Sequence, residues 1–353
     1  MKPVYLAGSG LACTLGLDQQ ASAAALRPVP PAASGASAAS DGDAPFPYRA
    51  IADVQGDWNE RARALIGQVA REAGAQHARA GALFIATSSF DIGAVEQGAE
   101  GMDYAAFADK IAAWLGWTGP VFVVSTACTS SLNALMAAHA LLRSGEAQDA
   151  LVLGVELKNQ LTLEGFAALQ LLSPSCSQPF GANRDGLVLG EAVAALRLST
   201  REPSPWQMLG GANVVDGSQP TSASFAAVVA MVQTALSQCG LAAQDIDLIK
   251  VQAAGSPVND AVEAQGLRAV FPVLPALVSL KPAIGHTMGA SGAAEIALLM
   301  ACLAQGEWPV CVHAVDETLG VHCTAQPPQA VRRVMATILG FGGGHATVVL
   351  ERA

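Results

Sequence analysis

The sequence predicts an α/β fold with two similar halves, because one pattern occurs twice along the 353-residue chain. The first copy, residues 121–145, reads VFVVSTACTSSLNALMAAHALLRSG, and the second, residues 279–306, reads SLKPAIGHTMGASGAAEIALLMACLAQG. Each copy is an apolar strand, a polar turn and a helix of small apolar residues that ends on glycine. Two such units predict a duplicated architecture in which each half is a sheet covered by helices. We expect an N-terminal half at residues 1–200 that carries Cys128, and a C-terminal half at residues 201–353 that carries His286.

Short apolar and β-branched runs predict the strands, of which Val121–Val124 is expected to be buried. In order, the strands are Val4–Ala7, Ala82–Ala86, Val121–Val124, Ala150–Val155, Leu187–Leu198 with a break at Gly190, Trp206–Val215, Asp247–Val251, Leu277–Leu280, Val334–Leu339 and Ala346–Leu350. Helical periodicity predicts helices at Trp58–Ala73, Asp103–Trp114, Thr129–Arg143, Leu163–Leu172, Ser224–Gly240 and Val262–Val270, besides the one after His286. The Pro-, Ala- and Ser-rich stretch Arg27–Phe46 predicts an exposed irregular segment.

Composition and charge restrict the class of protein. Hydrophobic residues make up 52% of the chain and charged residues 14%, which predicts a tightly packed protein with a subunit interface. The longest apolar run, Ile296–Ala304, is shorter than the about 20 residues of a spanning helix, so no membrane span is expected. The net charge of −10 argues against nucleic acid or anionic membrane as a partner.

The seven cysteines contain no Cys-x-x-Cys pair, so the sequence indicates neither a zinc site nor a disulfide framework. His77, His139, His313 and His322 also lack metal-ligand spacing, and no metal is expected. The N-terminus, MKPVYLAGSGLACTLG, has no signal-peptide core, and we expect a reducing, cytoplasmic location.

Cys128 lies where a predicted strand leads into a predicted helix. The free N–H groups and positive dipole end of a helix N-terminus favour a thiolate, which makes Cys128 a candidate nucleophile. The alternative interpretation is a small buried hydrophobic residue.

If the two halves are related, His286 occupies the equivalent turn and faces Cys128, an arrangement that suits acyl transfer. His286 alone is otherwise a structural histidine. Glu295 falls in an apolar helix and needs a partner, for which Lys281 is the nearest candidate. The run GFGGG at 340–344 lacks phosphate-loop chemistry, but its glycines allow a backbone N–H to approach an oxyanion.

These motifs together resemble the β-ketoacyl-acyl-carrier-protein synthases of the thiolase superfamily along nearly the whole chain. The matching motifs follow the family's order: GSGLACTLG, STACTSS, GFAALQLLS, NRDGLVLGEA, KPAIGHTMGASGAAE and GFGGG. The resemblance implies a five-layered αβαβα thiolase-like fold with two pseudo-symmetric halves and an obligate dimer. It implies no bound cofactor, because the acyl substrate arrives on the phosphopantetheine of an acyl carrier protein.

The resemblance also assigns roles. Cys128 resembles the acylated nucleophile, and its own N–H with that of Phe341 resembles the oxyanion hole. His286 resembles the histidine that polarises the malonyl carbonyl, Lys281 and Glu295 match the supporting pair, and Phe341 matches a gating phenylalanine.

The chain departs from the family at three points. Ala254 in VQAAGSPVNDAVE stands where the family has its first catalytic histidine, in a turn about two residues shorter. His345 follows GFGGG where the family usually has Asn. We expect His345 to substitute in space for the imidazole that is absent at Ala254. The region between Phe46 and Ala82 is also shortened.

Three hypotheses follow. The first is a divergent synthase-like acyltransferase of fatty acid or polyketide biosynthesis, which takes an acyl chain onto Cys128 but condenses poorly because of Ala254. The second is a non-elongating, chain-length-factor-like subunit in a heterodimer with a competent ketosynthase, as in aryl polyene or aromatic polyketide assembly. The third, a thiolase-like enzyme that acts on CoA esters, fits KPAIGHT and GFGGG less well.

Overall fold

The computed structural model describes residues 2–26, 46–52 and 54–353. The expected irregular segment Arg27–Phe46 lies outside the described residues except for Phe46. The strands are β1 Val4–Cys13, β2 Tyr48–Arg49, β3 Ala82–Ala86, β4 Val121–Val124, β5 Asp149–Glu156, β6 Leu189–Gly190, β7 Ala192–Ser199, β8 Trp206–Val215, β9 Leu248–Lys250, β10 Ala276–Val278, β11 Arg333–Leu339 and β12 Gly344–Arg352. The α-helices are α1 Gln19–Ala24, α2 Trp58–Glu72, α3 Ile92–Glu96, α4 Tyr104–Leu115, α5 Ser130–Ser144, α6 Gln160–Ala168, α7 Phe225–Cys239, α8 Pro257–Val270, α9 Lys281–Ile284 and α10 Ser291–Gln305.

Ten strands form one continuous sheet in the order β10-β9-β11-β12-β8-β1-β7-β5-β3-β4. Its two parts join through β1 and β8, which pair antiparallel only at Val4–Met208 and Tyr5–Gln207. Within this sheet, the strands from β1 to β7 lie on one side of the junction, and the strands from β8 to β12 lie on the other. The sheet is therefore built from two successive stretches of the sequence.

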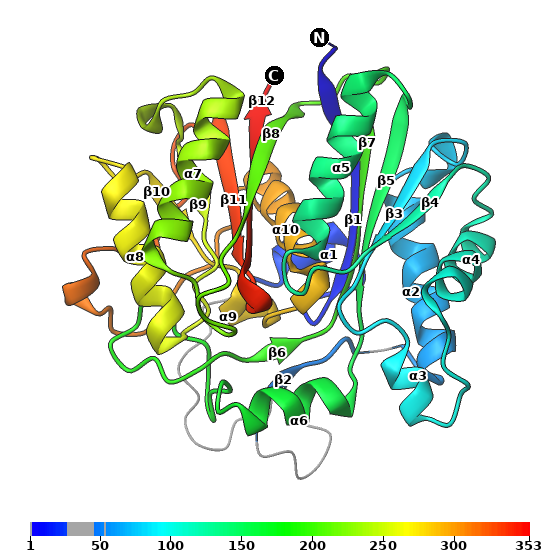
Figure 1. Cartoon of the computed structure of the whole chain (residues 1–353), viewed down its shortest axis with the longest axis horizontal. Helices are drawn as coiled ribbons and strands as arrows, with labels where there is room; N and C mark the ends of the chain where they lie inside the picture. The colour runs from blue at the N-terminus through cyan, green and yellow to red at the C-terminus, as the bar shows by residue number, and fades with distance from the viewer. Residues whose placement is uncertain (1, 27–45, 53) are drawn as a thin grey trace.

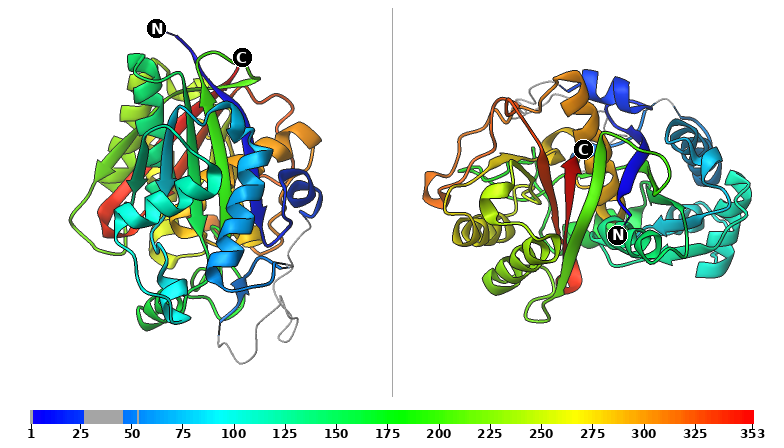
Figure 2. Two further views of the ribbon diagram at one scale, coloured as in Figure 1. Left: turned by 90° about the vertical axis from the view of Figure 1, so that its right-hand side faces the viewer. Right: turned by 90° about the horizontal axis from the view of Figure 1, so that it is seen from above.

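The helices form three layers around the two parts of the sheet, as Figure 1 shows: α7 and α8 on one outer side, α2 and α4 on the other, and α5 with α10 between. The view from above in Figure 2 shows the same arrangement. Separate apolar clusters fill each interface, with α5 and α10 in the central one, α2 and α4 in the second and α7 in the third. These layers confirm the predicted five-layered αβαβα fold.

The central helices pack closely because their facing residues are small. A Cβ at Gly292 of α10 would lie 2.8 Å from the side chain of Leu132 on α5. The segment Met288–Gln305 is long and apolar enough to cross a membrane by length and composition, yet 83% of it is buried inside the protein. Its apolar sequence is explained by its place in the middle layer.

Local signals explain why these helices begin and end where they do. Asp57 closes a capping box with Glu60 at the start of α2, and Ser224 accepts from the Ala227 N–H at the start of α7. Gly240 ends α7 in the left-handed conformation that favours glycine. The expected bounds therefore match α2, α4, α5 and α7 closely, whereas α6 lies earlier than expected and α8 begins at Pro257 instead of Val262. The short helices α1, α3 and α9 were not expected.

The expectation that Val121–Val124 is buried is wrong. The strand forms as β4, but it is the last strand of the sheet, and the Phe122 side chain is 43% exposed. An apolar run identifies a strand, but it does not distinguish a central position in the sheet from an edge position. Phe122 stacks on Phe84 of β3 on its inner side, with ring centroids 4.9 Å apart.

Candidate active site

The structure brings Cys128 and His286 together, as the sequence predicts. The Cys128 sulfur lies 3.1 Å from Nε2 of His286. Cys128 follows β4 in a turn in which Ala127 has a φ of 51°, just before α5 begins. His286 follows α9 through Gly285, where a Cβ would lie 2.7 Å from the Leu189 carbonyl oxygen. The His286 N–H donates to the Val188 carbonyl at 2.7 Å, which fixes the turn against the N-terminal half.

His286 is buried and oriented from its second ring nitrogen. Nδ1 lies 3.0 Å from the Ser291 hydroxyl, and this hydroxyl lies 3.3 Å from that of Thr287. Burial lowers the pKa of His286 to about 3, and the nearby charge of Lys281 acts in the same direction. The imidazole is therefore neutral at neutral pH. In the tautomer in which Nδ1 donates to Ser291, Nε2 accepts the thiol proton.

The expectation that the helix terminus favours a Cys128 thiolate is wrong. Burial raises the pKa of Cys128 to about 11, and this outweighs the N–H of Phe341 and the charge of Lys281, which both lower it. The Cys128 side chain is only 3% exposed, and the thiol precedes the first helical residue by two positions. The pair consequently rests as a neutral thiol beside a neutral imidazole.

Two backbone N–H groups donate hydrogen bonds to the Cys128 sulfur: its own and that of Phe341, which follows β11. Both lower the pKa of the thiol, as hydrogen-bond donors to a developing negative charge do. Donors fixed in this way also stabilise the oxyanion of a tetrahedral intermediate. The geometry therefore agrees with the oxyanion hole that the resemblance implies.

Lys281 and Glu295 form the expected buried pair, and a third residue joins them. Lys281 Nζ lies 2.6 Å from Oε1 of Glu295, while Lys250 Nζ lies 2.9 Å from Oε2. All three side chains are fully buried, and Lys250 also donates to the Thr337 carbonyl at 2.7 Å. Burial alone raises the pKa of Glu295, but the two lysines outweigh it and hold that pKa below its usual value.

Sequence reasoning missed Lys250. The signal that identifies it is a lysine inside the apolar strand β9, because a buried ammonium needs a partner just as the Glu295 carboxylate does. Burial lowers the pKa of Lys250 to about 8 although Glu295 raises it.

Ala254 is held in a turn that two buried carboxyl groups organise. Asp260 accepts from the N–H groups of Ala254 at 3.2 Å and Gly255 at 3.0 Å, and Glu263 accepts from Gln252 and Ala253, both at 2.7 Å. Burial raises the pKa of Asp260 to about 6 and that of Glu263 to about 7. Two buried carboxyl groups thus bind four backbone N–H groups of the segment 252–255.

Apolar side chains surround Ala254, which is 3% exposed. It packs in one cluster with Tyr48, Leu172, Leu187, Leu189 and Met288. Phe166 of α6 packs against this cluster and stacks on Phe341, with ring centroids 5.3 Å apart. Apolar contacts therefore run from Ala254 through Phe166 to the predicted gate at Phe341.

The expectation that His345 substitutes for the missing imidazole is wrong. Ala346, Val348 and Leu350 of β12 share the central cluster with Cys128, whereas Val349 belongs to the cluster under α7. Successive side chains of a strand point to opposite faces, so His345 lies on the face away from Cys128. Its two ring nitrogens have no hydrogen-bond partner among the described residues.

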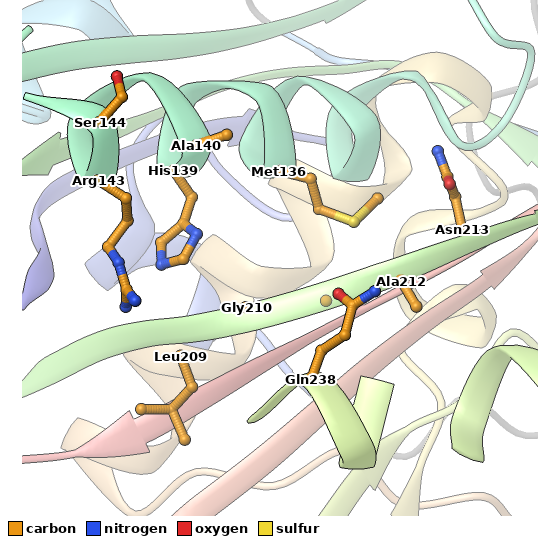
Figure 3. Close-up of a pocket in the computed structure, with 11 residues that line it drawn as sticks. Met136, His139, Ala140, Arg143, Ser144, Leu209, Gly210, Ala212, Asn213 and Gln238 are labelled. Atoms are coloured by element: carbon orange, nitrogen blue, oxygen red, sulfur yellow. The ribbon is translucent and has the colours of Figure 1, made fainter. Parts of the chain in front are cut away.

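A hollow lies away from these residues, between α5 and β8. It has a volume of about 670 Å³, and Figure 3 shows Met136, His139 and Arg143 of α5 around it, with Leu209 and Gly210 of β8 on its other side. Burial lowers the pKa of His139 to about 4, and the nearby Arg143 acts in the same direction. Neither Cys128 nor His286 lines this hollow. Across residues 2–26, 46–52 and 54–353, no group of three His, Cys, Asp or Glu side chains is arranged to hold a metal ion.

Comparisons with known proteins identify the family of the chain. Residues 67–204 match the family model of the β-ketoacyl synthase N-terminal domain, and residues 209–315 match that of the C-terminal domain. The chain is 28% identical over 264 residues to the mitochondrial 3-oxoacyl-[acyl-carrier-protein] synthase of Arabidopsis thaliana, in a match that covers 66% of this chain and 57% of that protein. It is 32% identical over 294 residues to the phenolphthiocerol synthesis polyketide synthase Pks15/1 of Mycobacterium marinum, covering 74% of this chain and 14% of that protein.

Two solved structures share the fold. The ketosynthase ApeO in complex with its chain length factor ApeC, from Xenorhabdus doucetiae, matches with a TM-score of 0.82 and 22% identity, over 100% of this chain and 98% of the matched chain. The AntDE:AntF complex, a type II acyl carrier protein with its hexaketide-bound ketosynthase, matches with a TM-score of 0.86 and 18% identity over 100% of both chains. The two domain models, the shared fold and the Cys128–His286 geometry lead to one conclusion: the chain belongs to the β-ketoacyl synthase family.

Proposed function

We propose that this chain is an acyltransferase of fatty acid or polyketide biosynthesis that takes an acyl group from a carrier protein onto Cys128, and that it condenses poorly. The observation that carries the proposal is the 3.1 Å contact between the Cys128 sulfur and His286 Nε2, together with the two N–H groups that bear on the same sulfur. A cytoplasmic location, where carrier-dependent synthesis takes place, is part of the proposal.

The transfer step uses these groups in sequence. His286 Nε2 takes the thiol proton as the Cys128 sulfur attacks the thioester carbonyl. No free thiolate has to form beforehand, which matters because the pKa of the Cys128 thiol lies near 11. The N–H groups of Cys128 and Phe341 stabilise the oxyanion. The intermediate collapses, the carbon–sulfur bond to phosphopantetheine breaks, and the departing thiolate takes the proton from the His286 imidazolium to leave as a thiol. Rotation of the Phe341 ring away from Phe166 opens the pocket to the acyl chain.

Condensation needs more than acylation, because the enolate from malonyl decarboxylation must also be stabilised. His286 supplies one donor, while Ala254 and its apolar neighbours supply none. Loss of one oxyanion donor typically costs about 10²–10³ in rate. We therefore infer efficient acyl transfer and slow condensation.

The experiment is intact mass spectrometry after incubation with an acyl-loaded carrier protein. We expect one adduct with the mass of the acyl group on the wild-type chain and none on Cys128→Ala. Cys176→Ala is a matched control, because Cys176 is also buried and should leave the adduct unchanged. An adduct that persists in Cys128→Ala, or none on the wild type with any carrier-bound chain, contradicts the proposal.

A second candidate is the non-elongating subunit of a heterodimer with a competent ketosynthase. Two observations favour it: the apolar environment of Ala254, and the exposed edge strand β4 with Phe122, where a partner chain can extend the sheet. The ApeO–ApeC pair shows the fold in such a complex.

Sedimentation of the chain alone and after co-expression with a ketosynthase from the same operon separates the two candidates. The subunit hypothesis predicts a stable heterodimer and poor solubility alone. A stable homodimer that excludes the ketosynthase contradicts it and leaves the acyltransferase as the remaining proposal.

A further inference from the structure

Lys250 is a buried cation that takes no part in the acyl-transfer step proposed above. It lies on β9, four positions before Ala254, with its ammonium 2.9 Å from Oε2 of Glu295 on α10. Lys281 binds the other oxygen of the same carboxylate at 2.6 Å. Two buried ammonium groups thus share one carboxylate, so the three side chains Lys250, Lys281 and Glu295 carry a net charge of +1 when all are ionised.

The charge of this cluster acts on the reacting atoms. Lys281 lowers the pKa of Cys128, whose largest influence remains burial. At His286, Lys281 and Lys250 both lower the pKa, whereas Glu295 raises it. Without Lys250, the Glu295 carboxylate would offset the charge of Lys281. The buried location of these groups makes their interactions stronger than in water.

We propose that Lys250 is a positioning residue that neutralises Glu295, so that the positive charge of Lys281 acts undiminished on the Cys128 sulfur. The inference rests on the proposed role of Cys128 as the acylated nucleophile. The groups that face the Lys250 ammonium are Glu295 of α10, Lys281 of α9, Glu263 of α8 and the Thr337 carbonyl of β11. Glu263 also accepts two N–H bonds from the turn that carries Ala254, so it remains bound to the backbone.

The test measures the rate of Cys128 alkylation by iodoacetamide at pH 7, followed by peptide mass spectrometry. Lys250→Met keeps the length of the side chain and removes its charge, and we expect alkylation about tenfold slower, the effect of one pKa unit. Lys250→Met/Glu295→Gln restores the net charge of +1 and should return the rate to within about threefold of the wild type. Lys110→Met removes a lysine on α4, bonded to Asn59, and should leave the rate unchanged.

Wild-type protein alone gives a second measurement if Lys250→Met does not fold. Since the pKa of Lys250 lies near 8, its charge is lost as the pH rises further. The alkylation rate should then climb by less than tenfold per pH unit between pH 8 and 9.5, although the Cys128 pKa near 11 alone gives a tenfold climb.

Two results overturn the inference: a Lys250→Met rate equal to the wild type, or a double variant as slow as Lys250→Met, which is what a merely structural role predicts. Alkylation needs no carrier protein. If the alkylation rates follow the predicted order but no acyl adduct forms, only the proposed function is contradicted. If the acyl adduct forms but the rates do not follow that order, only the role of Lys250 is contradicted.

Discussion

Replacement of Glu295 by leucine is expected to lower the free energy of unfolding by about 3–5 kcal/mol, the cost of leaving buried charges without their partner. Glu295 is the only carboxylate bonded to Lys250 and Lys281 among the described ion pairs, and all three side chains are fully buried. The variant forces two ammonium groups to face each other in an apolar layer. Urea unfolding at one fixed protein concentration measures the effect.

Two controls separate this cost from the loss of packing volume. Glu164→Leu changes an exposed carboxylate on α6 and should leave stability nearly unchanged. The triple variant Lys250→Met/Lys281→Met/Glu295→Leu removes every charge of the cluster and should recover most of the lost stability. A triple variant that is less stable than Glu295→Leu contradicts the electrostatic explanation.

The same carboxylate sets the sign of a pH effect. Its two lysines hold the folded-state pKa of Glu295 below the usual value of 4.5, despite burial. A carboxyl group with a lowered folded-state pKa stabilises the fold above its unfolded-state pKa, and that contribution is lost as the pH falls further. The stability gap between wild type and Glu295→Leu should therefore narrow below about pH 4.5.

The repeat was sufficient to predict two similar halves and the pairing of Cys128 with His286, for physical reasons, whereas the five layers were implied by the family resemblance. Two copies of a strand–turn–helix unit place two polar turns at equivalent ends of two similar sheets, and close packing of α5 on α10 brings those turns together. Glu295 required a cationic partner because it is fully buried in an apolar helix.

The errors concern quantities that depend on three-dimensional surroundings. The helix terminus beside Cys128 was visible in the sequence, but the burial that raises its pKa was not. His345 lies near Phe341 in sequence, yet the strand alternation of β12 turns it to the opposite face. Lys250 forms an ion pair with Glu295, 45 positions away, and no local pattern indicates a partner at that separation.

The last expected result concerns the missing imidazole. Ala254→His should raise malonyl decarboxylation by about 10²-fold, because one added donor restores what the loss of one donor typically costs. Ala254 lies in the Asp260-organised turn and packs against Met288, two residues beyond His286 in sequence. An imidazole at this position would therefore lie in the cluster that packs next to the His286 turn. Release of carbon dioxide from a malonyl-loaded carrier protein measures the rate.

The matched control is Ala254→Phe, which adds a ring of similar shape without a hydrogen-bond donor. Both variants insert atoms into a packed cluster and should lose about 1–3 kcal/mol of stability, so thermal unfolding of each accompanies the rates. Decarboxylation faster in the histidine variant alone means that the site lacks only a donor, and that it is an enzyme weakened at one residue. Equal rates in the two variants mean that the imidazole is not what limits decarboxylation, and this outcome favours the non-elongating subunit.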